Sequence, residues 1–513
     1  MAGRLALVLL AGLITILAFP HEKALSFLTW GCMVPWLITL PHAGWKERGI
    51  YGFLYGCLYI LPGQCTSIWH AIRIIKWSWI ASSIAVSSFF ICYIIPYVIF
   101  SCLYPYFKTT RSSGPLRLSM LFTCLISWFP LYFPVTPACL IHDQPLFFQI
   151  ADIGGETAVI FLILLVNISL AEMWNQRRNV FLLKFNMIIL GVILAATVSY
   201  GMVRMREYDT QKANNHGHWI TIMALQTTIY GPEDMRSLIR DNPNQRISAL
   251  EWTRYGIRQF PDIQLVVWPE SPVDTSMKNR SEILIRKLSE FSRQSGIPVL
   301  FSYLEKSEPA SETKEYNTLQ LMGGDGEPGA NYRKQILTPF YEYNPLKRWI
   351  HIGDYTIMAG DRDVLFPFGD IHIIPALCYE IHSSRYLRKN IQEGGNLVVH
   401  SANFYAFGKG PIGWIDLAMT KVHAVEHRVP IVRSTNYGYG AFIQADGTLA
   451  PGSLNPPSKP NALAFPLFVP EMDAPFNQIG NSFLYMLSLY VMVDTILIMI
   501  QSRKRKVLSE IDI

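Results

Sequence analysis

Eight apolar runs separated by short polar connectors are the feature that most limits what this chain can fold into. A membrane-spanning helix needs about 17–25 consecutive, mostly apolar residues. Seven of the runs lie before about residue 203, and the eighth begins after about residue 481. We therefore expect about eight membrane helices, over Leu5–Phe19, Ala24–Leu40, Ile50–Ile72, Trp77–Leu103, Leu118–Phe133, Thr157–Ala171, Phe185–Val203 and Phe483–Ile500.

The region between the seventh and eighth runs has a different composition. It contains charged residues, Gly and Pro turns and short strand-like runs, although only 16% of the whole 513-residue chain is charged. Soluble domains average roughly a quarter charged residues. A block of this length can bury a core of its own. The sequence therefore predicts membrane helices 1–7 in residues 1–203, a folded domain in 204–480, and helix 8 with a basic tail in 481–513.

The Lys and Arg residues of the short connectors predict the orientation, because cytoplasmic connectors carry an excess of these residues. If the N-terminus is cytoplasmic, the connectors and tail on that side hold thirteen of them, and the opposite connectors hold three. We therefore expect domain 204–480 to be extracytoplasmic. The basic tail at Arg503–Lys506 fits a cytoplasmic flank of the last helix. Nucleic-acid binding needs a broad basic face, so no nucleic-acid partner is expected.

Cysteine placement favours a reactive thiol in the folded domain. Seven of the eight cysteines lie in or beside the apolar runs, and Cys378 is the one in residues 204–480. It cannot form a disulfide within its own domain, and an unpaired thiol facing an oxidising compartment is unusual. Cys378 is therefore a candidate nucleophile, with a small buried core residue as the alternative interpretation.

The folded domain alternates strand-like and helix-like segments. Such alternation, with some hairpins, predicts an α/β or layered sandwich domain. The expected helices are Asn244–Phe260, Ser281–Ser295 and Ile415–Val425. The expected strands are Trp219–Gln226, Ile263–Trp268, Ile297–Leu304, Thr318–Met322, Ile371–Leu377 and Asn396–His400.

Three of the strand-like runs lead to a residue with a reactive side chain. Glu270 follows an apolar run, and a carboxyl group in an apolar pocket has a raised pKa that suits proton transfer. Lys334 follows the expected hairpin, and a fixed ammonium can stabilise an oxyanion. Cys378 ends a buried run, and a nucleophilic thiolate needs a base or cation beside it. Taken singly, Glu270 also fits a solvated turn and Lys334 a surface position.

The ordered set of motifs resembles a known family. Residues 268–270 read WPE, residues 332–342 read YRKQILTPFYE, and residues 378–380 read CYE. This set resembles the nitrilase, or carbon-nitrogen hydrolase, superfamily. The eight apolar runs, with Ile153-Gly154-Gly155 and RSTNYG at residues 433–438, resemble its apolipoprotein N-acyltransferase branch. The resemblance covers nearly the whole chain and implies an αββα sandwich, no metal or other cofactor, a monomer, and a multi-pass protein of the bacterial inner membrane with its catalytic domain on the periplasmic side.

The resemblance also implies roles for individual residues. Cys378 would be the nucleophile, Glu270 the general base and Lys334 the stabiliser of the tetrahedral intermediate. The implied reaction moves an acyl chain from a membrane phospholipid to Cys378 as a thioester. The chain then passes to the free α-amine of a diacylglyceryl-cysteine on an apolipoprotein, so the bilayer, a phospholipid donor and an apolipoprotein acceptor are the expected partners. The supporting residues implied are Glu342, Tyr379 and Glu380.

Departures from the family pattern fall at pocket and lid positions. Tyr341 stands where the family usually has Gly, and residues 403–407 lack its usual Asp and Trp. These changes bear on substrate preference more than on reaction type. Aromatic residues favour the membrane interface, so we expect mobile lids at 341–355 and 404–414, with buried loop packing as the alternative. The substrate or lid candidates are Trp268, Tyr341, Trp349, Asn403, Phe404, Tyr405, Phe407 and Trp414.

Other functions remain open on the sequence. The same catalytic set could serve a membrane-tethered amidase that uses water, or an N-acyltransferase paralogue with a different amine acceptor. His423, Glu426 and His427 match the H-x-x-E-H pattern of some zinc proteases, at a position that the resemblance fills without metal. A transporter would carry intramembrane charges along an ion pathway, and Asp494 is the main such residue.

Overall fold

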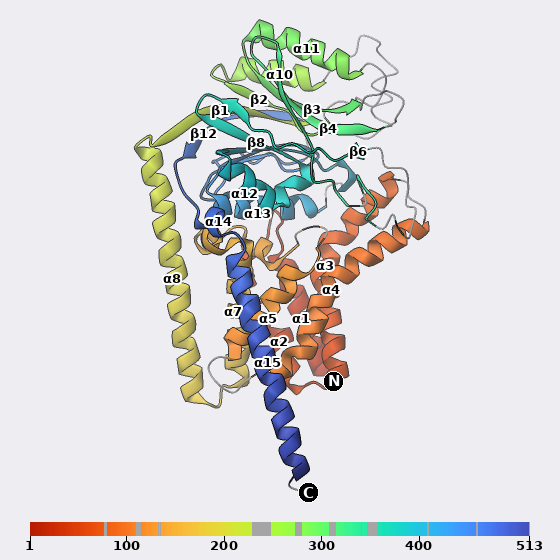
Figure 1. Ribbon diagram of the computed structural model, residues 1–513, viewed down its shortest axis with the longest axis vertical. Helices are drawn as coiled ribbons and strands as arrows, with labels where there is room; N and C mark the ends of the chain where they lie inside the picture. Colours follow the sequence, from red (N-terminus) through yellow and green to blue (C-terminus); the bar gives the residue numbers. More distant parts are fainter. Residues whose placement is uncertain are drawn as a thin grey trace. The chain divides into compact units, whose positions relative to one another are not determined.

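The computed structural model (Figure 1) describes residues 1–75, 79–108, 114–131, 133, 135–227, 248–271, 280–306, 314–339, 341–345, 348, 357–407, 410–457 and 460–511. The chain divides into two compact units. The helical unit comprises Met1–Gly63, Ser87–Val203 and Gln478–Ile513, and the sheet unit comprises Gln64–Val86 and Arg204–Asn477.

The helical unit contains several of the apolar helices that the sequence predicts. Three described helices are long and apolar enough to cross a membrane, namely α7 (Ala151–Asn175), α8 (Val180–Ala213) and the Ser482–Gln501 part of α15 (Ser482–Ile511). Ala2–Ala18 and Ile91–Phe107 form shorter apolar helices. The first of these is α1, and the second is the C-terminal part of α4 (Trp79–Phe107). The unit's other helices include α3 (Trp45–Ile75) and α5 (Gly114–Trp128).

The second apolar run departs from the expected single helix. Residues 24–42 form three short helical pieces, η1 (Ser26–Trp30), α2 (Val34–Leu37) and η2 (Leu40–His42). Broken backbone in an apolar region must satisfy its polar groups within the protein. Asn167 of α7 does this, because its Oδ1 accepts from the Met33 N–H at 2.9 Å and its Nδ2 donates to the Thr29 carbonyl at 2.8 Å. This contact between distant segments is what the local apolar pattern could not predict.

Asp494, in the apolar Ser482–Gln501 part of α15, has an oppositely charged partner. Arg117 of α5 donates to Asp494 Oδ2 of α15 through Nη2 at 2.7 Å and Nε at 2.9 Å. A charge in an apolar region is retained where an opposite charge neutralises it. The pair therefore ties two helices of the helical unit together.

The sheet unit is built on strands in the order β5-β4-β3-β2-β1-β10-β9-β8-β7, with β6, β11 and β12 paired to β4, β10 and β1. The central strands β2, β1, β10, β9 and β8 run parallel. Strand bounds are β1 Gly217–Thr227, β2 Leu265–Val267, β3 Val299–Lys306, β4 Glu315–Met322, β5 Pro328–Arg333, β6 Ile357–Met358, β7 Phe366–Phe368, β8 Ile371–Leu377, β9 Leu397–Asn403, β10 Ile431–Asn436, β11 Ala441–Ile443 and β12 Asn461–Pro470.

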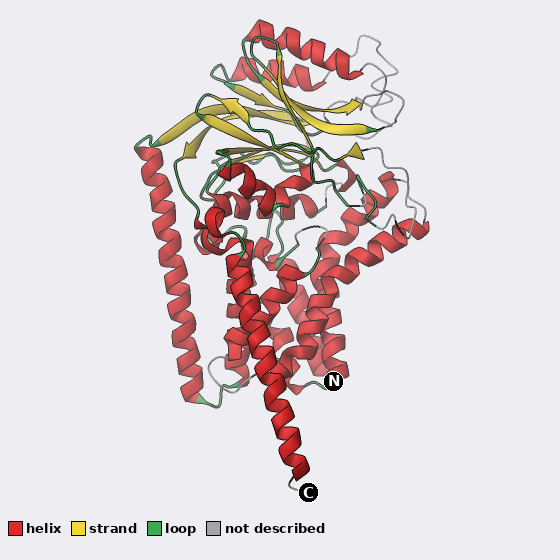
Figure 2. Ribbon diagram, in the orientation of Figure 1, coloured by secondary structure: helices red, strands yellow, loops and turns green. Residues whose placement is uncertain are grey.

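Alternation along β1 divides the core between two layers. Ile220, Ile222 and Ala224 pack in one cluster, whereas Met223 and Leu225 pack in another, because successive strand residues point to opposite faces. The second cluster includes side chains of α10 (Ser248–Gln259) and α11 (Arg280–Ser295), and the first includes side chains of α12 (Ser384–Gln392) and α13 (Ile412–His427). Figure 2 shows the strands between these two helical layers, in agreement with the expected sandwich.

The elements that the sequence did not predict include helix α12 and strands β6, β7, β10, β11 and β12. Residues Asn461–Pro470 pair antiparallel with β1 along its length, although this strand contains Pro466 and ends at Pro470. Proline cannot donate to a strand ladder, so it weakens the sequence signal and is tolerated mainly at edges. In the sheet, β12 has β1 as its one partner strand among the described residues.

Candidate active site

Glu270, Lys334 and Cys378 meet because each follows a strand that runs in the same direction. Strands β2 and β8 belong to the parallel set. Strand β3 is parallel to β2, β4 is antiparallel to β3, and β5 is antiparallel to β4. Strand β5 therefore runs in the same direction as β2. The carboxyl ends of parallel strands form the usual ligand-binding edge of such sheets. Lys334 comes directly after β5 and Cys378 directly after β8. Strand order therefore assembles residues that lie far apart in the sequence.

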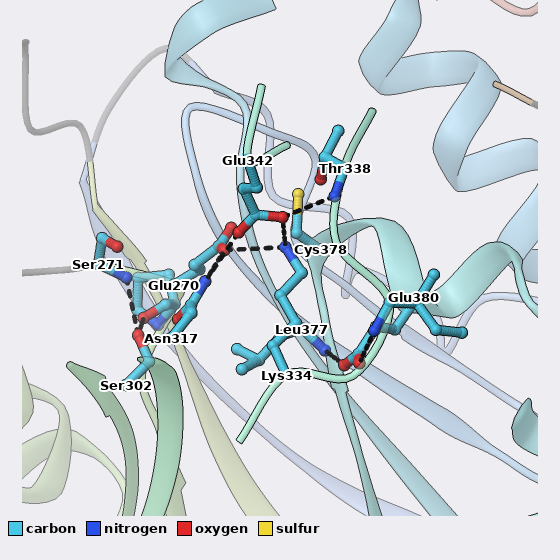
Figure 3. A network of polar contacts seen from close by, with 12 residues as sticks. Glu270, Ser271, Ser302, Asn317, Lys334, Thr338, Glu342, Leu377, Cys378 and Glu380 are labelled. Atoms are coloured by element: carbon cyan, nitrogen blue, oxygen red, sulfur yellow. Dashed lines mark hydrogen bonds and ion pairs between the residues drawn. The ribbon is translucent and has the colours of Figure 1, made fainter. Parts of the chain in front are cut away.

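Lys334 lies between two buried carboxylates (Figure 3). Its Nζ is 2.7 Å from Glu342 Oε2 and 3.6 Å from Glu270 Oε1. The Asn317 amide donates to Glu270 Oε1 at 2.6 Å, and the Thr338 N–H donates to Glu342 Oε2 at 2.7 Å. The lysine is 1% exposed and the carboxylates 6% and 5%, so the charges interact with little screening by water.

The two carboxylates differ in proton affinity. Burial raises the pKa of Glu270, and the negative charge of Glu342 adds to this effect, against the opposing influences of Lys334 and Asn317. Burial also acts to raise the pKa of Glu342, but the Lys334 charge and hydrogen bonds from Lys334 and Thr338 outweigh it and lower the pKa. Paired groups with divergent pKa values take different roles. Glu270 suits proton transfer, and Glu342 suits a permanent anion.

Cys378 begins η4 (Cys378–His382) with a backbone φ of +50°. Such a conformation is strained for a residue with a side chain and persists only where the surroundings hold it. Burial raises the pKa of the Cys378 thiol well above 9, and the negative charges of Glu270 and Glu342 add to this. Lys334 and the backbone N–H of Asn403 oppose the shift. The raised pKa favours the neutral thiol in the resting protein.

Glu380 connects the Lys334 segment to the Cys378 segment. Its Oε1 accepts from the Tyr332 hydroxyl at 2.6 Å and from the Gln335 and Ile336 N–H groups at 2.7 and 3.0 Å. Its Oε2 accepts from the Leu377 N–H at 2.9 Å. Burial raises the pKa of Glu380 to about 7. The carboxyl group therefore supports the site by fixing two backbone segments, as Figure 3 shows for Leu377.

Two of the aromatic candidates lie beside the reactive groups. Tyr379 follows Cys378, and burial raises the pKa of its phenol to about 12. Tyr341 is 47% exposed. Its phenol end is nonetheless enclosed by protein, and this burial, followed by the charges of Glu270, Glu342 and Cys378, raises the pKa of the phenol.

The side chains of Trp268 and Phe404 are buried, and exposed lid residues would not be. Trp268 is fully buried with Val266 in the core beneath α10 and α11, and its Nε1 donates to Thr253 Oγ1 at 2.9 Å. The reason is strand alternation, which sends positions 266 and 268 to the same face. Phe404 is 3% exposed and packs against Gly438. Trp268 therefore contributes to the core, and Phe404 is packed inside the domain.

The other described substrate and lid candidates lie at the end of β9, in the short helix η5 (Tyr405–Phe407) and at the start of α13. Asn403 Oδ1 accepts from the Tyr405 N–H at 3.0 Å, and the Tyr405 ring packs 5.8 Å from Tyr437. Trp414 packs 4.2 Å from Tyr439 and is half-buried. Phe407, also half-buried, lies 6.2 Å from the Phe404 ring. Trp349 lies outside the described residues.

Asn317 is a site residue that the sequence reasoning missed. It lies on β4, and its Nδ2 reaches Glu342 Oε1 at 3.4 Å in addition to its bond with Glu270. Its main-chain carbonyl accepts from the Lys334 N–H at 2.9 Å. The available signal was its position opposite Lys334 in the predicted hairpin, because facing hairpin residues lie close together.

The residues of the zinc-like pattern make contacts with other side chains. His423 Nδ1 lies 3.0 Å from Glu426 Oε2, and Glu426 also accepts from Ser384. His427 Nδ1 lies 2.6 Å from Asn477 Oδ1. Within the described residues, no group of three or more His, Cys, Asp or Glu side chains is placed to hold a metal ion.

Comparison with known protein families identifies both parts of the chain. Residues 196–457, more than half of the chain, match the carbon-nitrogen hydrolase family. Residues 11–169 match the apolipoprotein N-acyltransferase N-terminal domain.

Relatives named apolipoprotein N-acyltransferase match along the chain to different extents. The protein from Borreliella burgdorferi is 22% identical, over 97% of this chain and 96% of its own length. The protein from Bdellovibrio bacteriovorus is 25% identical, over 60% of this chain and 59% of its own length. Among solved structures, an amidase from Nesterenkonia sp. is 17% identical with a TM-score of 0.40, and the match covers 53% of this chain and 96% of the amidase. The chain belongs to the carbon-nitrogen hydrolase family, and within it to the apolipoprotein N-acyltransferases.

Proposed function

We propose that the chain transfers an acyl chain from a membrane phospholipid, through a thioester on Cys378, to the N-terminal amine of a diacylglyceryl-cysteine on an apolipoprotein. The observation that carries the proposal is the Lys334 ammonium held between Glu270 and Glu342 beside the Cys378 thiol. An N-terminal domain of the apolipoprotein N-acyltransferase kind precedes this site in the same chain. The membrane helices supply the apolar surroundings that two lipid substrates require.

Acylation begins when Glu270 takes the proton of Cys378. The thiolate attacks the ester carbonyl of the phospholipid, and Lys334 stabilises the negative charge that develops on the carbonyl oxygen. Collapse of this tetrahedral intermediate breaks the ester C–O bond. Glu270 returns its proton to the departing oxygen, so the products are a Cys378 thioester and a lysophospholipid.

Deacylation uses the same groups in the opposite direction. The free amine of the acceptor attacks the thioester carbonyl, and Glu270 takes a proton from the nitrogen. The C–S bond then breaks and the sulfur regains a proton from Glu270. The amide product leaves with the acyl chain, and the thiol is restored for another cycle.

The membrane setting is part of this proposal. About eight helices span the bacterial inner membrane, and residues 204–480 face the periplasm, as the Lys and Arg distribution predicts. The protein acts as a monomer. Tyr341, Asn403, Tyr405, Phe407 and Trp414 act at the substrate pocket and its lids.

The direct test is mass analysis of the intact protein after incubation with phospholipid. We expect an acyl adduct on the native protein that is absent from Cys378→Ala, and its discharge by a diacylglyceryl-cysteine peptide with formation of an amide. Release of free fatty acid without amide would show an amidase that uses water. Discharge by another amine in preference to the peptide would show a different acceptor. An adduct of equal yield on Cys378→Ala would refute the thioester.

A further inference from the structure

A chain of buried polar side chains leads from α13 to the main chain of Cys378. Its members are His400 on β9, Asp416 and Thr420 on α13, and Arg433 on β10, each at most 2% exposed. Burying such groups is costly unless each has a partner. The chemistry proposed above uses none of the four.

The Arg433 guanidinium is fixed from several sides. It forms an ion pair with Asp416, and its Nη1 donates to Thr420 Oγ1 at 2.6 Å. Its Nε donates to the Tyr439 carbonyl at 3.1 Å. Asp416 is held in turn, because its Oδ1 lies 2.7 Å from His382 Nε2. These contacts fix the orientation of the guanidinium, so that the second N–H of Nη1 points toward His400.

These partners determine the tautomer of His400. Its Nδ1 lies 3.1 Å from Arg433 Nη1, and its Nε2 lies 2.9 Å from the Cys378 carbonyl oxygen. A guanidinium can only donate and a carbonyl can only accept. The Nδ1 atom therefore carries the lone pair, and Nε2–H donates to Cys378. Burial and the Arg433 charge lower the pKa of His400 to about 3, which keeps the ring neutral.

The hydrogen bond from His400 fixes more than one atom. The Cys378 carbonyl belongs to the peptide group that joins Cys378 to Tyr379. In a trans peptide the C=O and N–H lie in one plane and point in opposite directions. A carbonyl directed at His400 therefore directs the Tyr379 N–H away from His400. The Cys378 backbone is at φ +50°, a conformation that depends on such restraints.

We propose that His400 is a positioning residue for acyl transfer, which holds the Cys378–Tyr379 peptide so that the Tyr379 N–H donates to the oxyanion formed on the acyl carbonyl. His400 itself touches no reacting atom. His400 acts together with Arg433, which sets its tautomer. Strand β9 thus contacts Cys378 twice, through the His400 side chain and through the Asn403 N–H. This inference rests on the proposed acyl transfer through Cys378.

Two substitutions separate the contacts of His400. The amide of Asn in His400→Asn sits near the position of Nδ1, so it can still accept from Arg433 but does not reach the Cys378 carbonyl. The longer Gln in His400→Gln can place its amide N–H near the position of Nε2 and restore the donor. His372→Asn is the matched control, because His372 lies exposed on the strand that leads to Cys378.

The experiment compares two reactions of Cys378 in the full-length protein. Acylation by phospholipid forms an oxyanion, whereas alkylation by iodoacetamide forms none and reports only on the thiol. We expect His400→Asn to slow acylation per active thiol by about 10- to 100-fold through the maximal rate rather than KM, which is the scale of a mispositioned catalytic group. Alkylation should change less than about threefold. His400→Gln should recover most of the acylation rate, and His372→Asn should match the native protein.

Each other outcome counts against the role of His400. An unchanged acylation rate in His400→Asn refutes it. Equal losses of acylation and alkylation, or no recovery in His400→Gln at equal thermal stability, show a structural residue only. If the native protein itself forms no acyl adduct while iodoacetamide alkylates Cys378, the proposed function fails instead, so the two failures are distinguishable.

Discussion

The Lys334 ammonium is bound more closely to Glu342, at 2.7 Å, than to Glu270, at 3.6 Å. The lysine charge is thus balanced mainly by the carboxylate whose pKa is lowered, and Glu270 keeps a raised pKa. A general base works best when its pKa lies nearer the operating pH. In the proposed mechanism, Glu342 therefore leaves Glu270 available as the base.

Replacing Glu342 by Gln should slow acylation and change its pH dependence. The negative charge of Glu342 raises the pKa of Glu270, so its loss lowers that pKa and lets Lys334 pair with Glu270. We expect a loss of about 100-fold in the acylation rate, on the scale of general-base catalysis. The acidic limb of the pH–rate profile should shift to lower pH. As a control, Glu327→Gln, at an exposed carboxylate, should leave the acylation rate and its pH dependence unchanged. A shift of the acidic limb to higher pH in Glu342→Gln would contradict the role given to Glu342.

Replacing Asn317 by Ala should move the same limb in the opposite direction. The Asn317 amide donates to Glu270 Oε1 and so lowers the Glu270 pKa. Without this bond the pKa rises further, and a higher pH is needed to ionise the base. We expect a rate loss of about tenfold at neutral pH that is partly recovered at higher pH. A uniform loss at every pH would show that the Asn317 amide does not set the pKa of Glu270.

Replacing Glu380 by Gln should alter the pH dependence of stability. The folded-state pKa of about 7 lies above the ordinary value of 4.5, so the folded state binds the proton more tightly than the unfolded state. In the native protein, the protonated Glu380 makes its full contribution to the unfolding free energy below about pH 4.5. This contribution decreases by up to about 3 kcal/mol as the pH rises to 7.

The Glu380→Gln variant lacks this titration. Its amide NH2 would face the Leu377 N–H, so two donors would oppose each other. The variant should therefore be less stable than the native protein at low pH. The difference in thermal unfolding midpoint between the two proteins should therefore narrow as pH rises from 4.5 to 7. Unfolding in detergent, followed by circular dichroism at several pH values, measures this. A constant difference across the range would show that Glu380 does not titrate there.

Replacing Tyr341 by Gly should change substrate preference more than reaction type. The Tyr341 side chain is about half exposed beside Glu270 and Cys378. Its removal enlarges the space around the thiol. We expect the preference among phospholipids of different acyl length to change by about tenfold, a typical effect of altered apolar contacts in a pocket.

Tyr341→Phe separates the ring from the hydroxyl. It should keep the native preference if the ring shapes the pocket. The competition assay uses mixed phospholipids, with the acyl adduct on Cys378 read by mass. An unchanged preference in Tyr341→Gly would show that this ring does not contact the acyl chain.

The sequence by itself determined the parts that depend on local pattern. Strand-like apolar runs located β2 and β8, and the motifs that follow them placed Glu270 and Cys378 directly after buried strands. Helical spacing located α10, α11 and α13. These features follow from side-chain periodicity within ten to twenty residues, which is the range over which a sequence can be interpreted directly.

Only the tertiary structure decided which distant groups touch. Asn317 and Glu270 are 47 residues apart, and Glu380 and Gln335 are 45 residues apart. Their contacts arise from strand order and register, since parallel strands joined by long crossovers bring remote chain segments to one edge. The same cause explains why Trp268 belongs to the core and His400 reaches the Cys378 carbonyl. Periodicity within one strand shows which residues share a face, whereas their partners are set by neighbouring strands that the local pattern does not identify.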